Sequence, residues 1–148
     1  MRRIKINVGS LVMGRTLDRG LLSAVPEISD VGTTKDDDDP HHRLPWRARF
    51  QGYAAPPRSP YEKLHQHLVL LHERYPKLRE AGVEKVQVYL TYSTDDPHLP
   101  TELSAEEIAL LAGVNGSLST TFDSSFTENS WIPFADSIEQ EGDPETTP

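Results

Sequence analysis

The sequence contains no cysteine among its 148 residues. Disulfide bonds and thiolate metal sites are therefore excluded. Long apolar runs are absent too, and no window approaches the roughly 18 uncharged apolar residues that a membrane-spanning helix needs. The first residues carry charge, but they lack an apolar segment of the length found in signal peptides. We therefore expect no contact with a membrane and a cytoplasmic location.

Familiar catalytic motifs are missing as well. The sequence has no Gly-x-Ser-x-Gly nucleophile elbow and no His-Glu-x-x-His zinc motif. The glycines from Gly9 to Gly14 lack both the spacing and the lysine of a phosphate-binding loop. We therefore expect a protein that is not an enzyme and has no cofactor.

Positive charge is scarce in two parts of the chain. The whole sequence has 23 acidic side chains against 15 Lys and Arg, a net charge of −8. Four consecutive acids, Asp36, Asp37, Asp38 and Asp39, account for part of this excess. From residue 128 to the end there are six acids and no Lys or Arg. Nucleic-acid binding requires a basic stripe instead, so we expect no nucleic-acid partner.

The elements that the sequence does contain predict one α+β domain over residues 1–126. Apolar alternation indicates strands at residues 4–8, 46–50, 85–92 and 118–122, with residues 29–45 read as a loop. Helical patterns fall at residues 16–25, from residue 59 onward and at 104–113. This order predicts a roughly four-stranded sheet with helices packed mainly on one face. Residues 127–148 are expected to form an acidic, partly disordered tail.

The two later helices have clear start signals. Ser59, Pro60 and Glu62 offer a capping hydroxyl, a proline at the first helical position and a glutamate three residues after the serine. Ser104 and Glu107 form a second capping box. The first of these helices carries an apolar stripe at spacings of three and four: Tyr61, Leu64, Leu68, Leu71, Tyr75 and Leu78.

Metal binding is the first candidate chemistry. The four aspartates lie next to His41 and His42, and carboxylates with imidazoles can hold a divalent cation. However, the run lacks the turn glycine and the closing glutamate of a calcium loop, so we expect no metal site. A solvated loop and an acidic docking patch remain open. His65 and His72 lie about 10 Å apart along the helix axis, which is too far for two ligands of one metal ion. We therefore interpret His65, His67 and His72 as boundary residues, each with a buried ring and a solvent-exposed edge.

Four apolar residues stand out as candidate contacts for a partner. Val69 and Leu70 lie outside the leucine stripe of the long helix, so they are either covered by a loop or the tail, or exposed to a partner. Trp131 and Phe134 interrupt the otherwise polar tail, where they either pack back onto the domain or anchor an interface. Together with Asp36 to Asp39 they form our predicted partner-binding set.

As a small acidic α+β chain without a catalytic motif, this sequence resembles bacterial immunity proteins, which neutralise a cognate toxin by binding it. The pattern of residues 46–122, including the capped stretch LSAEEIALLA at 103–112, is also similar to other bacterial domains of this layout. The resemblance to immunity proteins implies a non-catalytic binding protein with a protein partner, such as a basic toxin domain. Two other classes remain open: a small enzyme with a His/Asp site, and a structural subunit of a phage or secretion assembly.

Overall fold

The computed structural model describes residues 4–33, 44–94 and 103–122, which form five strands and three helices. Along the chain these elements are β1 (Ile4–Gly14), α1 (Arg19–Leu22), β2 (Ile28–Thr33), β3 (Trp46–Phe50), α2 (Glu62–Glu80), β4 (Lys85–Thr94), α3 (Ala105–Gly113) and β5 (Gly116–Phe122).

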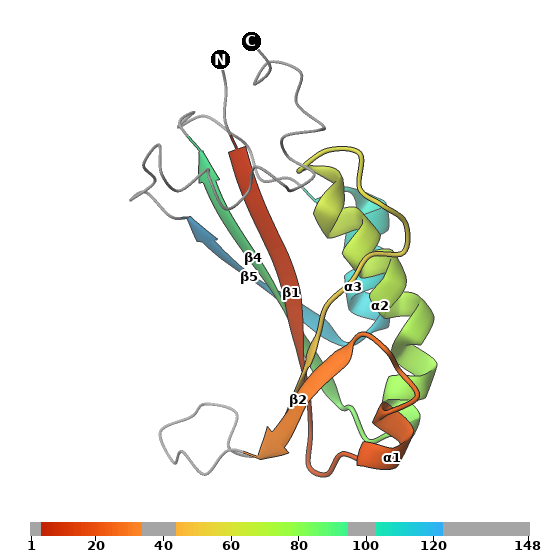
Figure 1. Ribbon diagram of the computed structural model, residues 1–148. Coiled ribbons are helices and arrows are strands. Elements are labelled where there is room, and N and C mark those ends of the chain that lie inside the picture. The colour runs from red at the N-terminus through yellow and green to blue at the C-terminus, as the bar shows by residue number, and fades with distance from the viewer. Residues whose placement is uncertain (1–3, 34–43, 95–102, 123–148) are drawn as a thin grey trace.

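The strands form one mixed sheet in the order β2-β3-β1-β4-β5. All neighbours are antiparallel except β4 and β5, which run parallel because α3 connects them. The three helices lie on one face of this sheet (Figure 1). The predicted α+β class and the placement of the helices are therefore confirmed, whereas the sheet has five strands in place of four.

The additional strand is β2, in the region that we predicted as a loop. Its polar residues and Gly32 interrupt the apolar alternation by which a strand is recognised. In the structure, β2 is an irregular edge strand. The register against β3 shifts between Ser29 and Gly32, and Asp30 has a positive φ of 53°. Ile28 and Val31 nevertheless pack against the core. The loop prediction is therefore wrong for residues 29–33.

Strand β1 is longer than residues 4–8 because its alternation continues through a polar position. Ser10 is buried like Ile6 and Val12, and β1 pairs with β4 from Ile4 to Met13. A buried serine gives no apolar signal, so the sequence pattern ends at Val8, six residues before the end of β1 at Gly14. The central position of β1 between β3 and β4 requires this full length.

The long helix α2 supplies most of the helical side of the core. Leu64, Leu68, Leu71 and Leu78 are buried against the sheet, as the stripe predicted. Tyr61, the first residue of the predicted stripe, is exposed. It is the N-cap of a helix that begins at Glu62, and this N-cap makes no side-chain hydrogen bond. The capping role predicted for Ser59 is therefore wrong.

The backbone after α2 packs closely against the end of β1 and the residues that follow it, at two glycines. A Cβ on Gly14 would overlap the carbonyl oxygen of Gly82, and a Cβ on Gly82 would overlap that of Thr16. Gly82 also has a φ of +107°, which L side chains rarely adopt. The amide of Asp18 donates to the carbonyl of Ala81 at 2.8 Å beside this crossing. Helix α1, reduced to four residues, follows with Asp18 as its N-cap.

Helix α3 begins as the sequence predicts. The Ser104 hydroxyl accepts from the Glu107 amide at 3.1 Å, and the Glu107 carboxylate accepts from the Ser104 amide at 2.8 Å. None of the nine residues of α3 is buried. Among residues 4–33, 44–94 and 103–122, no helix is long and apolar enough to cross a membrane.

Candidate functional site

Most of the predicted partner-binding set cannot be placed. Asp36, Asp37, Asp38, Asp39, Trp131 and Phe134 all lie outside the described residues. Their roles therefore stay predictions.

Leu70 is covered by a loop, which is one of the two alternatives predicted for it, so its assignment to the partner-binding set is wrong. It is only 4% exposed and belongs to the core. The connector after β3 covers this side of α2: the Ala54 amide donates to the Gln66 carbonyl at 3.0 Å, and a Cβ on Gly52 would lie 2.9 Å from Leu70 Cδ2. Val69 is half-buried. The helix is therefore covered on two sides, which explains its second apolar flank.

A buried polar centre joins α2 to the sheet, and sequence reasoning missed it. His67 Nε2 lies 2.6 Å from Ser10 Oγ, and His67 Nδ1 lies 2.9 Å from the carbonyl oxygen of Gly52. The carbonyl can only accept, so Nδ1 carries the proton and Nε2 accepts from the serine hydroxyl. The ring also meets Phe50 edge-on, with the centroids 5.7 Å apart. The prediction of a solvent-exposed edge is wrong for His67, which is 0% exposed.

A serine on a histidine whose other nitrogen is oriented by an acceptor is also the arrangement of a nucleophile and its base. Here both partners are enclosed, since Ser10 is only 5% exposed. Desolvation by burial lowers the pKa of His67, although its hydrogen bond to Gly52 opposes this shift. A neutral ring with both nitrogens satisfied favours a structural tie within the core over a reacting site.

The other two helical histidines differ in their surroundings. His65 Nδ1 lies 3.5 Å from Glu107 Oε2, the carboxylate that closes the capping box of α3, so this pair links α2 to α3. His72 is exposed. Within the part of the chain that the structure describes, no group of three or more His, Asp or Glu side chains is arranged to hold a metal ion.

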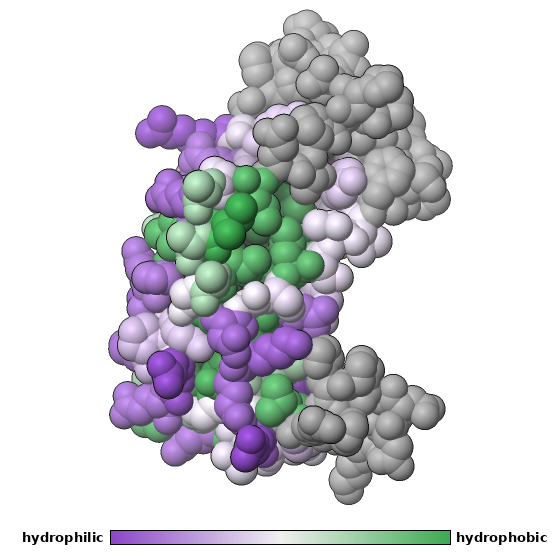
Figure 2. Space-filling view, turned by 180° about the vertical axis from the view of Figure 1, so that it is seen from behind, coloured by the Kyte–Doolittle hydropathy of each residue, from purple (hydrophilic) through white to green (hydrophobic). Residues whose placement is uncertain are grey.

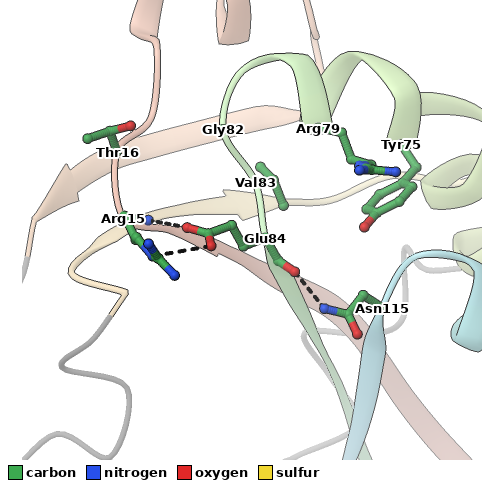
Figure 3. A pocket seen from close by; sticks show the side chains of 8 residues that line it. All are labelled: Arg15, Thr16, Tyr75, Arg79, Gly82, Val83, Glu84 and Asn115. Atoms are coloured by element: carbon green, nitrogen blue, oxygen red, sulfur yellow. Dashed lines mark hydrogen bonds and ion pairs between the residues drawn. The ribbon is translucent and has the colours of Figure 1, made fainter.

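An open polar pocket of about 660 Å³ lies between the end of α2, the start of β4 and the turn before β5 (Figure 3). Glu84 organises it: its carboxylate accepts from the Arg15 amide at 2.8 Å and pairs with the Arg15 guanidinium at 3.5 Å. The Glu84 carbonyl accepts from Asn115 Nδ2 at 2.6 Å. Arg79 and Tyr75 lie along one side.

This pocket can attract an anionic group, because its lining has two guanidiniums and one carboxylate. The lining contains no histidine and so offers no neutral general base near pH 7. Arg15 is already paired with Glu84, and Arg79 is the second cation of the lining. We therefore assign the pocket no reaction.

The remaining candidate is an apolar surface formed by α3 and β5, visible from behind the molecule (Figure 2). Ile108 is 54% exposed. Leu110, Leu111 and Leu118 are only half-buried, as is Leu103 just before the helix. We call these five residues the α3–β5 surface. Solvent-exposed alanines on α3 (Ala105, Ala109 and Ala112) extend it. A helix of this composition normally buries one face, so this surface is the strongest candidate for an interface.

Comparison with known protein families, with curated proteins and with solved structures finds no match to this chain.

Proposed function

We propose that this chain is a non-catalytic binding protein that contacts a protein partner through the α3–β5 surface. The observation that carries the proposal is that an apolar helix, α3, has no buried residue. Ile108 lies at its centre with more than half of its surface exposed. Contiguous exposed apolar residues are typical of contact sites in proteins that are otherwise polar.

Charge supports a basic partner, of which a toxin domain neutralised by an immunity protein is the class that we propose. The described residues contain eleven Lys and Arg against nine Asp and Glu, so they are almost neutral. The excess acid of the chain therefore lies in the other segments, including Asp36 to Asp39 and the six acids after residue 127. Complementary charge of this kind speeds the encounter with a basic protein and is screened by salt.

The enclosed Ser10–His67 pair supports the non-catalytic part of the proposal. A substrate would have to open the core between β1 and α2 to reach the serine hydroxyl. The alternative of a small enzyme with a His/Asp site gains no support from His65, whose carboxylate partner caps a helix.

The test compares three baits in a lysate of the source organism: the full chain, Ile108→Glu and Leu21→Glu. Leu21 is the matched control, since it is also an exposed aliphatic residue, at 40%, but lies on α1. A protein recovered by the first and third baits is then purified. We expect Ile108→Glu to weaken its binding by at least about tenfold, as at an interface hot spot.

Salt provides the second measurement. Raising the ionic strength should slow association of the recovered protein and leave its dissociation rate nearly unchanged. The proposal is wrong if Ile108→Glu binds as tightly as Leu21→Glu.

A further inference from the structure

The α3–β5 surface lies beside a free edge of the sheet. Strand β5 is the last in the order β2-β3-β1-β4-β5, and none of the described strands pairs with its outer edge. Leu118 points to the same face of the sheet as Val88, its partner in β4, which is buried beneath the helices. The half-buried leucines of this surface are therefore partly in contact with water. At this place both α3 and the outer edge of β5 could pack against a further segment of polypeptide. An exposed edge next to apolar side chains is a site of association.

The chain itself continues from this place. Phe122 ends β5, and 26 residues follow it. Trp131 and Phe134 are the large aromatics nearest to the middle of this segment. Trp131 lies nine positions after Phe122, and an extended chain covers up to about 3.3–3.6 Å per residue, or roughly 30 Å. Strand β5 is only seven residues, about 23 Å, so Trp131 can reach every part of the surface.

We propose that the C-terminal segment of the same molecule occupies the α3–β5 surface in the free protein, with Trp131 and Phe134 as its anchors. Docking within one molecule is favoured over docking between molecules, because the short tether holds the aromatics at a high effective concentration. A partner that uses this surface then has to displace the segment. The inference concerns the free chain and so does not rest on the proposed partner.

The contact is apolar rather than electrostatic. Helix α3 contributes Glu106 and Glu107 and no basic residue, while the segment after residue 127 carries six acids and no Lys or Arg. Salt should therefore leave the docked state unchanged or strengthen it, by screening repulsion between like charges. Added salt should instead slow the association of the chain with a basic partner.

The experiment follows the fluorescence of Trp131 in the full chain. The sequence has two tryptophans, so Trp46→Phe leaves Trp131 alone. Acrylamide quenching of this variant is compared with that of a peptide of residues 123–148. We expect quenching about threefold weaker in the full chain and emission at shorter wavelength, because docking removes the indole from water. Adding Ile108→Glu should restore the quenching and emission of the peptide, whereas adding Leu21→Glu should not.

Two controls keep the outcome decisive. Circular dichroism and the emission of Trp46 in a Trp131→Phe variant verify that Ile108→Glu remains folded; if it does not, Ile108→Ser replaces it. Quenching is also measured over a hundredfold range of protein concentration. Peptide-like quenching in the full chain would overturn the proposal, as would insensitivity to substitution of Ile108. Protection that grows with concentration would also overturn it, since the occupant would then be a second copy.

Discussion

His67 is the most informative residue to perturb, because it connects β1, α2 and the connector after β3 from inside the core. His67→Leu keeps a similar volume but leaves the Ser10 hydroxyl and the Gly52 carbonyl without their hydrogen-bond partner. Each unsatisfied buried polar group costs about 1–3 kcal/mol. The edge contact with Phe50 is lost as well. We expect the free energy of unfolding to fall by about 2–5 kcal/mol.

A double-mutant cycle isolates the contribution of the pair. Ser10→Ala alone leaves His67 Nε2 unsatisfied, whereas the double variant Ser10→Ala/His67→Leu removes both groups. The double variant should therefore be more stable than the sum of the two losses predicts, by about 1–3 kcal/mol. Chemical denaturation at about pH 8, followed by circular dichroism, measures all four proteins. A coupling energy below about 0.5 kcal/mol would show that the hydrogen bond contributes nothing.

The same residue sets a pH dependence whose sign is fixed by its environment. Burial lowers the pKa of His67 below its ordinary value of 6.5. As the pH falls, the unfolded chain therefore takes up this proton before the folded protein does. The contribution of His67 to stability is complete above about pH 6.5 and is lost as the pH falls through the folded pKa, with a slope of at most about 1.4 kcal/mol per pH unit. His67→Leu should lack this component. If its deficit relative to the wild type stays constant between about pH 7.5 and about pH 5.5, the neutral, buried ring is refuted.

Three further substitutions test the frame that carries the α3–β5 surface. Leu68→Ala should lower the free energy of unfolding by about 2–5 kcal/mol, because this leucine is buried between α2 and the sheet. Val69 is only half-buried, so Val69→Ala should lower it clearly less in the same denaturation series. Gly82→Ala should lower the free energy of unfolding by at least about 1–3 kcal/mol from backbone strain alone. Gly32→Ala is the control, because Gly32 has open space around it. Equal losses of stability in the two variants would contradict the close approach of Gly82 to Thr16. Ser104→Ala should cost about 1 kcal/mol by removing the cap of α3, and an unchanged thermal midpoint would show that the capping box does not stabilise the helix.

Local sequence patterns were sufficient where neighbouring residues alone determine the structure of a segment. The alternation in β4 and the capping box of α3 depend on residues only a few positions apart, so both were predicted correctly. Strand β2 was missed because its polar residues and its bulge remove the alternation, and only pairing with β3 stabilises it. Ser10 and His67 lie 57 positions apart, so no local pattern relates them.

The sequence by itself determined the α+β class, the leucine face of α2 and the start of α3, because periodicity and capping act within one turn or one strand. It also determined that the acidic excess lies in a few segments. Only the tertiary structure decided which apolar residues are available to a partner. The connector after β3 covers Leu70, whereas α3 lies at the border of the sheet, where the described residues leave Ile108 54% exposed. Exposure depends on what packs against a residue from far away in the sequence, and a helical wheel contains no information about that neighbour.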